Sequence, residues 1–373
     1  MQVPLLDLKA QYSSYKDAAL KEIKEVCDDQ YFINGPKVVG FEKMVEEYCG
    51  TGHALGVSSG SDALIIALMV EGIGEGDEVI MPPFTFFATA GAVSRVGAKP
   101  VFVDVEEGSF NLDPIKVKAA INENTADIIP VHLYGQMADM DPIMEIAEEH
   151  SLIVIEDGAQ AIGSEYKGRK SGTIGHYGTF SFFPSKNLGG FGDGGMVMTD
   201  TEERLEKLQY FRNHGSNPKY YHKFIGGNFR LDALQAAVLS TKLPLLNDWH
   251  DARKENADLY RQLFADSSVA DKVKLPEVQT YTTRHIYNQF CIRIADGRRD
   301  ELKEALIAAG VGCDVYYPLC LHEQECFSEL GYKHGDFPVA ELLASDIMAI
   351  PIFPELTREQ QEYVVATIEK ALS

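Results

Sequence analysis

The chain has 373 residues, 45% of them hydrophobic, which suffices for a sizeable buried core and roughly two to three domains. The formal net charge of −22 argues against binding along nucleic acid, because that function needs a basic surface. The six cysteines are widely spaced and form no CxxC pair, so we expect reduced thiols and neither disulfides nor a zinc site. We recognise no signal peptide and no apolar run of membrane-spanning length, and therefore expect a cytoplasmic protein.

From about residue 50 to 160, short apolar runs alternate with amphipathic stretches. The runs predict strands within 53–60, 77–82, 99–105, 127–133 and 151–160. A helix is predicted over 61–73, and two more begin at the Asp-Pro pairs Asp113-Pro114 and Asp141-Pro142. The run over 151–160 stays apolar without alternation until its acidic end, as strands buried on both faces do. This order predicts an open α/β sheet with helices on both sides.

After residue 172 the pattern changes. Two strands, within "HYGTFSFF" and "GGMVMTD", flank a loop that contains Lys186, and a long helical stretch starts near 232 and is interrupted at Pro244. We therefore expect a large domain over 1–247 and a small domain over 248–373. The small domain mixes a strand within 286–295 with a helix over 301–310, and a last helix over 358–372 begins with a capping box.

Lys186 lies between a phenylalanine-rich run and a glycine-rich run, "TFSFFPSKNLGGFGDGG". Most lysines are solvated, and a solvated lysine at a strand end is the simple interpretation. The alternative is a nucleophilic amine in a partly dry site, where desolvation lowers its pKa. Asp157, which ends a buried strand, is either a helix cap or the partner of a protonated ring nitrogen, and Gln160 lies one turn beyond it.

Two further features fit the second interpretation. The segment "SSGSDAL" runs from Ser58 into a helix N-terminus, which suits a phosphate as well as an ordinary cap. Phe86, in "PPFTFFAT", either stacks on a flat cofactor or packs in the core. With Ser181 on the strand before Lys186, the set predicts a lysine that binds pyridoxal 5'-phosphate (PLP) covalently. A dinucleotide loop at "NLGGFGDGG" is disfavoured, because the required strand–helix order is missing.

The motifs "SGSDAL", "VHLYGQMADM", "IEDGAQAIGSEYKGRKSGTIGHYGTFSFFPSKNLG", "FRNHGS" and "GGNFRLDALQAAVL" resemble the DegT/StrS family of nucleotide-sugar aminotransferases. The resemblance implies fold type I, the aspartate aminotransferase fold: a mixed, mostly parallel sheet flanked by helices, plus a smaller α+β C-terminal domain. It also implies a homodimer with shared sites. Its catalytic and cofactor-binding residues here are Lys186 (covalent link), Asp157 (ring nitrogen), Gln160 (phenolic oxygen), Phe86 (stacking), Ser59, Gly60, Ser61, Asp62 and Ser181 (phosphate), and Asn228 from the partner subunit.

Dehydratase relatives carry a histidine at the position of Lys186, so the resemblance favours transamination with glutamate as the expected amino donor. The segments "RHIYNQFCIR" and "VYYPLCLHEQECF" resemble members that aminate carbon 3 of dTDP-linked 3-keto-6-deoxy sugars. Tyr316, Tyr317 and His322 are then sugar-side residues, or aromatics that only pack the small domain. The alternatives are amination at carbon 4, a PLP-dependent sugar dehydratase or lyase, and a non-enzymatic regulator, which the acidic composition disfavours.

Overall fold

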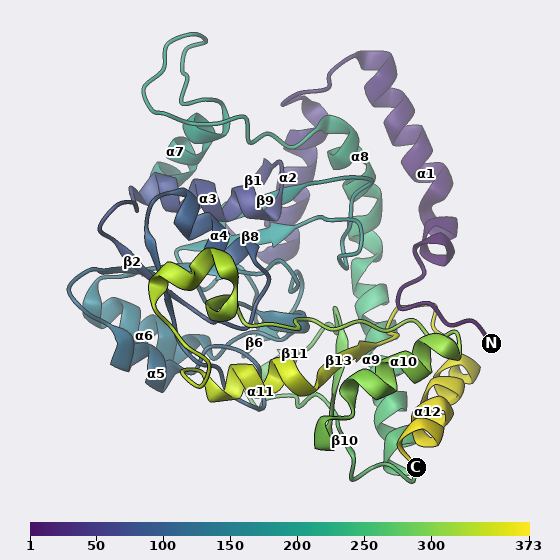
Figure 1. Ribbon diagram of the computed structural model, residues 1–373. Coiled ribbons are helices and arrows are strands. Elements are labelled where there is room, and N and C mark those ends of the chain that lie inside the picture. Colours follow the sequence, from purple (N-terminus) through teal and green to yellow (C-terminus); the bar gives the residue numbers. More distant parts are fainter.

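The computed structural model describes every residue from Met1 to Ser373, and a seven-stranded sheet forms its centre (Figure 1). The strands lie in the order β1-β9-β8-β5-β4-β2-β3, and neighbouring strands are parallel except where β9 is one of the pair. The predicted mixed, mostly parallel sheet is confirmed. Its strands are β1 (His53–Val57), β2 (Glu78–Met81), β3 (Lys99–Phe102), β4 (Thr125–Ile128), β5 (Ile153–Asp157), β8 (Tyr177–Ser181) and β9 (Gly195–Thr199).

Helices cover both faces of this sheet, which explains why its strands are apolar without alternation. On β5, Val154 packs into a cluster with α5 and α6, whereas its neighbour Ile155 packs into a cluster with α3 and α4. No helix of the molecule combines the length and apolar character that crossing a bilayer requires. The helices of this part are α1 (Leu8–Asp29), α2 (Pro36–Cys49), α3 (Gly60–Glu71), α4 (Ala88–Arg95), α5 (Pro114–Ala120), α6 (Met140–His150), α7 (Glu202–Arg212) and α8 (Ala233–Lys242).

The C-terminal part has its own sheet and its own core. Strands β10 (Val273–Lys274), β12 (Phe290–Ile294) and β13 (Ile347–Ile350) form a three-stranded antiparallel sheet. Thr357 and Gln360 form the predicted capping box at the start of the last helix. The remaining elements are α9 (Leu246–Ala265), α10 (Arg299–Ala308), α11 (Pro338–Asp346), α12 (Arg358–Leu372), the small sheet of β6 (Glu165–Tyr166), β7 (Arg169–Lys170) and β11 (Thr282–Arg284), and the 3-10 turns η1 (Leu133–Gly135), η2 (Leu243–Leu245), η3 (Ala295–Gly297), η4 (Leu321–Glu323) and η5 (Glu325–Leu330).

We propose that residues 1–247 form a large domain and residues 248–373 a small one. A core of 23 buried residues supports this division, because all its members but Val3 lie after residue 256. The boundary itself falls inside the first turn of α9, which begins at Leu246. Val3 pairs with Val311, so the N-terminal segment contacts the small domain although we assign it to the large one.

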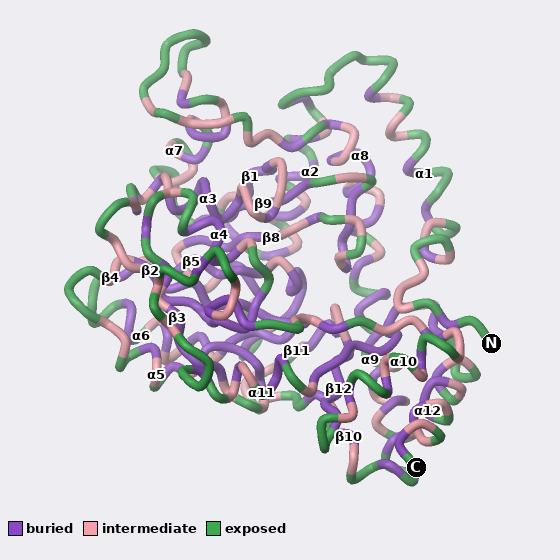
Figure 2. Tube along the Cα trace, viewed as in Figure 1, coloured by how far each residue is buried: buried purple, intermediate pink, exposed green.

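Between α7 and α8 the chain leaves the body of the molecule as a long loop, residues 213–232 (Figure 1). Figure 2 shows that the loop is mostly exposed. Tyr220, Tyr221 and Ile225 are 78%, 71% and 92% exposed. Several large apolar side chains gathered on one exposed segment are typical of a surface that another protein covers.

Candidate active site

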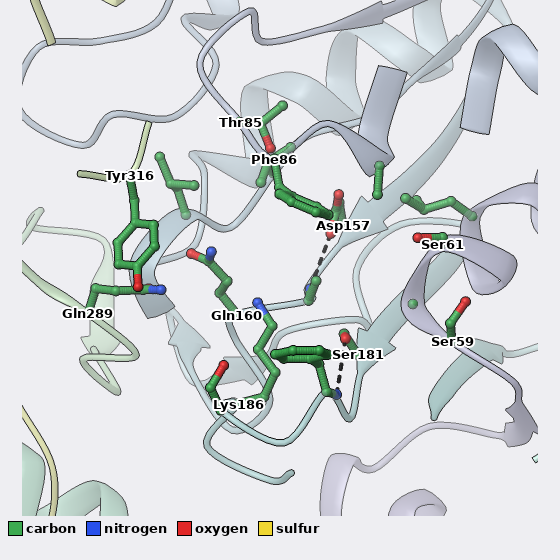
Figure 3. Close-up of a pocket in the computed structure, with 18 of the residues that line it drawn as sticks. Ser59, Ser61, Thr85, Phe86, Asp157, Gln160, Ser181, Lys186, Gln289 and Tyr316 are labelled. Atoms are coloured by element: carbon green, nitrogen blue, oxygen red, sulfur yellow. Dashed lines mark hydrogen bonds between the residues drawn. The ribbon is translucent and has the colours of Figure 1, made fainter. Parts of the chain in front are cut away.

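A cavity of about 460 Å³ opens where β1, β5 and β8 end, at the carboxyl edge of the parallel strands. Figure 3 shows Lys186 and Gln160 pointing into its middle, with Ser59 and Ser61 on one side and Tyr316 and Gln289 on the other. The wall consists of Ser59, Gly60, Ser61, Leu64, Thr85, Phe86, Ala88, Val131, Leu133, Asp157, Ala159, Gln160, Ser181, Phe183, Ser185, Lys186, Asp193, Gly194, Gln289, Tyr316 and Tyr317.

Lys186 projects into the cavity from the loop between β8 and β9. The loop is closed by two backbone hydrogen bonds, from the Lys186 N–H to the Phe183 carbonyl (2.8 Å) and from the Gly190 N–H to the Phe182 carbonyl (2.8 Å). The side-chain amine makes no hydrogen bond or ion pair within the chain. Burial lowers the pKa of Lys186 to about 8, and the nearby Asp157 carboxylate partly opposes this shift. Roughly a tenth of the amine is therefore unprotonated at pH 7, far more than for an ordinary lysine.

Asp157 is the last residue of β5, and its side chain is buried at the floor of the cavity. The Thr89 hydroxyl donates to its Oδ2 at 2.8 Å, and the Ala159 N–H donates to its Oδ1 at 3.2 Å. These two donors compensate the carboxylate for the water it has lost. The next residue is Gly158. A Cβ at this position would lie 2.8 Å from the Phe180 ring, so only glycine lets the chain pass β8 this closely.

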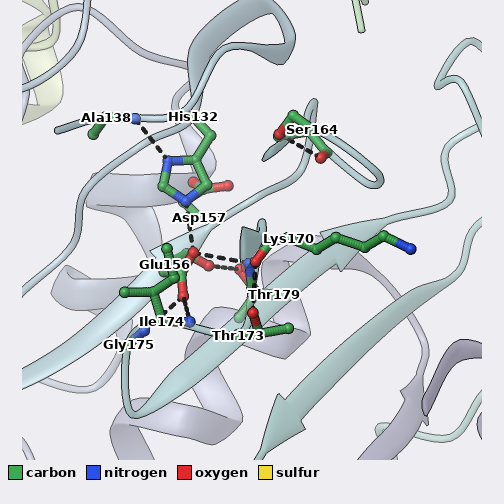
Figure 4. A network of polar contacts seen from close by, with 12 residues as sticks. His132, Ala138, Glu156, Asp157, Ser164, Lys170, Thr173, Ile174, Gly175 and Thr179 are labelled. Carbon is green, nitrogen blue, oxygen red and sulfur yellow. Dashed lines mark hydrogen bonds and ion pairs between the residues drawn. The ribbon is translucent and has the colours of Figure 1, made fainter. Parts of the chain in front are cut away.

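A second acid, Glu156, lies on the opposite face of the same strand and is fully buried (Figure 4). Its carboxylate accepts the backbone N–H groups of Gly172, Ile174 and Gly175 at 2.6–2.8 Å, and lies 2.8 Å from His132 Nε2. Because the Ala138 N–H donates to the other ring nitrogen of His132, Nε2 carries the hydrogen that is donated to Glu156. This network fixes the backbone on the side of β5 that faces away from the cavity.

Gln160 is held at both ends of its amide group. The Tyr134 backbone N–H donates to its Oε1 at 2.7 Å, and its Nε2 donates to the Tyr317 hydroxyl at 3.2 Å. The ring of Tyr317 also lies 6.1 Å from the ring of Phe86, which is 58% exposed and lines the cavity. The amide and the two aromatic rings therefore form one continuous part of the wall.

The opposite end of the cavity is built by the start of α3 and the end of β8. The Ser59 hydroxyl caps α3 by accepting the Asp62 N–H at 3.1 Å, and the Gly60 and Ser61 N–H groups have no acceptor in the chain. A Cβ on Gly60 would lie 2.7 Å from the Cβ of Ser181, so the two elements touch at this point. Free N–H groups, hydroxyls and the positive end of a helix dipole together suit an anion such as phosphate.

The family model that describes DegT/DnrJ/EryC1/StrS aminotransferases matches residues 13–369. The chain belongs to this family. The predicted family, the predicted fold class and the prediction that the protein is an enzyme are therefore confirmed.

Several known proteins are similar to this chain over nearly its whole length. A protein named pleiotropic regulatory protein from Geobacillus stearothermophilus is 49% identical over 99% of this chain and 98% of its own length. UDP-N-acetyl-3-dehydro-alpha-D-glucosamine 3-aminotransferase from Acidithiobacillus ferrooxidans is 44% identical, with the same two coverages. The crystal structure of S. venezuelae DesV in complex with a ketimine intermediate superimposes with a TM-score of 0.95, at 41% identity over 99% of this chain and 98% of that one.

Ten of the thirteen residues that the sequence suggested for this aminotransferase site line the cavity. The other three do not. Asp62 is in the first turn of α3 but accepts the Ser58 hydroxyl at 2.6 Å. Asn228 is exposed on the loop between α7 and α8. His322 is buried away from the cavity with its Nε2 3.1 Å from Glu341, so its position does not support a sugar-side role.

Several wall residues of this aminotransferase were not predicted. Thr85, Asp193 and Gln289 line the cavity, and Thr89 and Tyr134 hold residues that line it. Thr85 and Thr89 lie in the quoted run "PPFTFFAT", where their hydroxyls next to a candidate stacking residue were the available signal. Nothing in the local sequence marks Tyr134, because it acts on Gln160 through its backbone N–H.

Proposed function

We propose that this protein is a PLP-dependent aminotransferase that moves an amino group from glutamate to the 3-keto group of a nucleotide-linked sugar. The first candidate substrate is a dTDP-linked 3-keto-6-deoxyhexose. The observation that carries the proposal is the amine of Lys186, which has no hydrogen bond, has a pKa lowered to about 8, and shares one cavity with the buried carboxylate of Asp157. An amine that is to bind an aldehyde must be partly neutral and must have space in front of it.

The two ends of the cavity fit the two ends of PLP. The hydroxyls of Ser59, Ser61 and Ser181, with the free N–H groups of α3, would hold the phosphate. At the floor, the Asp157 carboxylate would hold the protonated ring nitrogen, and Thr89 keeps that carboxylate oriented. When bound, PLP supplies a ring that accepts electrons from the carbon next to the transferred nitrogen.

Lys186, Gln160 and Phe86 would act on the middle of the cofactor. Lys186 Nζ would hold its aldehyde carbon and, once released, would carry the proton from the α-carbon of the amino donor to that cofactor carbon; the reverse transfer would deliver a proton to the sugar carbon. Gln160 would donate from Nε2 to the phenolic oxygen, and the exposed ring of Phe86 would lie against the cofactor ring. Each of these actions needs only a group that already faces the cavity.

The sugar would enter at the end opposite the serines, beside Tyr316 and Gln289 (Figure 3). The test is to incubate the PLP-loaded enzyme with glutamate and each of four sugars, dTDP- and UDP-linked, with the keto group at carbon 3 or carbon 4, and to read the products by mass. We expect amination of the 3-keto sugars. Amination of the 4-keto sugars alone would refute amination at carbon 3. Loss of water or a lyase product without glutamate would refute transamination.

We further propose that the enzyme is a homodimer in which Asn228 of each subunit completes the site of the other. Lys186 is the only cationic side chain in the cavity wall, although the substrates are anionic. The exposed loop between α7 and α8 contains Lys219 and Lys223 as well as Asn228, and its exposed apolar side chains suit a contact with a second subunit.

Mixing two inactive variants tests this proposal directly. A subunit with Lys186→Ala and a subunit with Asn228→Asp would form a mixed dimer with one intact site if Asn228 acts across the interface. Half of randomly mixed dimers are mixed, so about one quarter of the wild-type sites should return after unfolding and refolding the two variants together. If Asn228 served its own subunit, no mixed dimer would contain an intact site and no activity would return.

A further inference from the structure

Tyr317 contacts the cofactor end of the cavity rather than the sugar end. Its hydroxyl is 3.2 Å from Gln160 Nε2, and its ring packs 6.1 Å from Phe86 and 6.2 Å from Phe84. Gln160 and Phe86 are the residues that our proposed function assigns to the phenolic oxygen and the ring face of PLP. Tyr317 therefore touches two cofactor-binding residues, although the sequence suggested a contact with the sugar.

The Gln160 amide has one defined orientation because its two ends have different partners. The Tyr134 N–H donates to Oε1 at 2.7 Å, so Oε1 must face Tyr134 and the NH₂ group must face the other way. There the Tyr317 oxygen accepts one of the two Nε2 hydrogens. The second hydrogen has no acceptor in the chain, and the residue lines the cavity.

Tyr134 also holds the segment that carries Tyr317. Its own hydroxyl donates to the carbonyl oxygen of Tyr316, and its ring is buried. Tyr134 belongs to the large domain and Tyr316 and Tyr317 to the small one, so this bond fixes the tyrosine pair relative to Gln160 across the proposed boundary. The geometry is thus set by three residues from segments far apart in the sequence, Tyr134, Gln160 and Tyr317.

We propose that Tyr317 is a positioning residue for the cofactor, which acts through Gln160: it holds the amide so that the second Nε2 hydrogen points at the phenolic oxygen of PLP. This inference rests on the proposed function. It gives two adjacent tyrosines different tasks, because the hydroxyl of Tyr316 has no hydrogen-bond partner in the chain and Tyr316 lies, like Gln289, on the side of the cavity away from the serines (Figure 3). Tyr316 faces the substrate, whereas Tyr317 faces the cofactor.

The experiment compares Tyr317→Phe with Tyr316→Phe as the matched control. Phenylalanine keeps the ring and removes only the hydroxyl, so Tyr317→Phe loses the bond to Gln160 alone. We expect the dissociation constant for PLP to rise about fivefold, the value of one ordinary hydrogen bond. We also expect a higher midpoint for the pH titration of the visible absorbance. Without the Tyr317 hydroxyl, Gln160 donates a weaker hydrogen bond to the phenolic oxygen. That oxygen then accepts more strongly from the protonated nitrogen that joins Lys186 to the cofactor, which raises the pKa of this nitrogen. Tyr316→Phe should leave both readouts unchanged and raise KM for the sugar.

A double-mutant cycle with Gln160→Ala separates positioning from a general structural role. If Tyr317 acts through Gln160, removing its hydroxyl has no further effect on the PLP dissociation constant once Gln160 is gone. Effects that multiply, or a Tyr317→Phe enzyme with an unchanged dissociation constant and an unchanged absorbance midpoint, would overturn the inference. A wild-type protein that shows no PLP absorbance at all would instead overturn the proposed function, so the two failures are distinguishable.

Discussion

Two desolvated lysines of this protein, Lys186 and Lys242, have the same lowered pKa and entirely different surroundings. Burial lowers the pKa of each to about 8. Lys242, on α8, is 2% exposed, donates to the Gly189 carbonyl at 2.5 Å, and lies 5.0 Å from the ring of Tyr15 and 5.8 Å from that of Trp249. The amine of Lys186 has none of these contacts and faces an open cavity.

The comparison shows that desolvation alone does not mark a reactive lysine. Lys242 even borders a hollow of its own, of about 410 Å³, but no carboxylate lines it. What distinguishes Lys186 is the combination of a free amine, the Asp157 carboxylate and a helix start with unpaired N–H groups in one cavity. The two lysines are also connected, because Lys242 donates to Gly189 in the loop that carries Lys186.

The largest expected effect comes from replacing each lysine in turn. Lys186→Ala should reduce transamination by about 10³-fold or more, because it removes the nucleophile and the proton carrier together. Lys242→Met should cost less than about tenfold, since it loosens the loop but removes no reacting group. Steady-state rates of the two PLP-loaded variants test the contrast, and equal losses would refute our assignment of different roles.

Lys242 should control how stability depends on pH. Its folded-state pKa of about 8 is lower than its unfolded value of 10.5, so the folded protein binds fewer protons between these values and gains stability as pH rises. The stabilisation is complete above pH 10.5 and is lost as pH falls toward 8. The free energy of unfolding of the wild type relative to Lys242→Met should therefore rise by roughly 3 kcal/mol from pH 8 to 10.5. Denaturant unfolding of the cofactor-free proteins measures this difference, and a flat difference would show that Lys242 is not desolvated.

The smallest expected effect concerns the coupling between Lys186 and Asp157. Because the Asp157 carboxylate raises the pKa of Lys186, Asp157→Asn should lower it further. The pH dependence of Lys186 acylation in the cofactor-free protein, read by peptide mass spectrometry, gives this pKa. Lys242 provides the internal reference, and its titration should be the same in both proteins. A midpoint for Lys186 that does not move would mean that the two groups are uncoupled.

Where local pattern and tertiary packing agree, the sequence predicted the structure well. The unbroken apolar run at 151–160 became β5, buried on both faces and ending at Asp157, and the capping box at Thr357 started α12 as predicted. Helix α1 was not predicted, because its buried positions Gln11, Tyr15, Ala19 and Val26 include only one aliphatic residue larger than alanine. An apolar stripe this weak is not sufficient to predict a helix from the sequence.

The predicted strand over 127–133 pairs with β5 as far as His132 and then gives way to a turn. Strand β4 ends at Ile128, but the pairing with β5 resumes beyond Pro130: the Asp157 N–H donates to the Pro130 carbonyl at 2.9 Å, and the His132 N–H donates to the Asp157 carbonyl at 3.0 Å. The chain then makes a 3-10 turn over Leu133–Gly135, in which Tyr134 takes a positive φ of 57° and directs its N–H to Gln160. Contacts with distant residues therefore hold this turn, among them Gln160, which lies 26 positions later.

The sequence by itself determined the fold class, the family and the residue types at the strand ends, because apolar runs, helix starts and the acid, lysine and serine positions follow from local order along the chain. Only the tertiary structure decided which hydrogen-bond partners Tyr134, Tyr317 and His322 have. Gln160 and Tyr317, which share a hydrogen bond, are 157 residues apart in the sequence, and buried His322 contacts Glu341. Hydrogen bonds act over about 3 Å, so side chains from distant segments acquire their partners only when the folded chain brings them together.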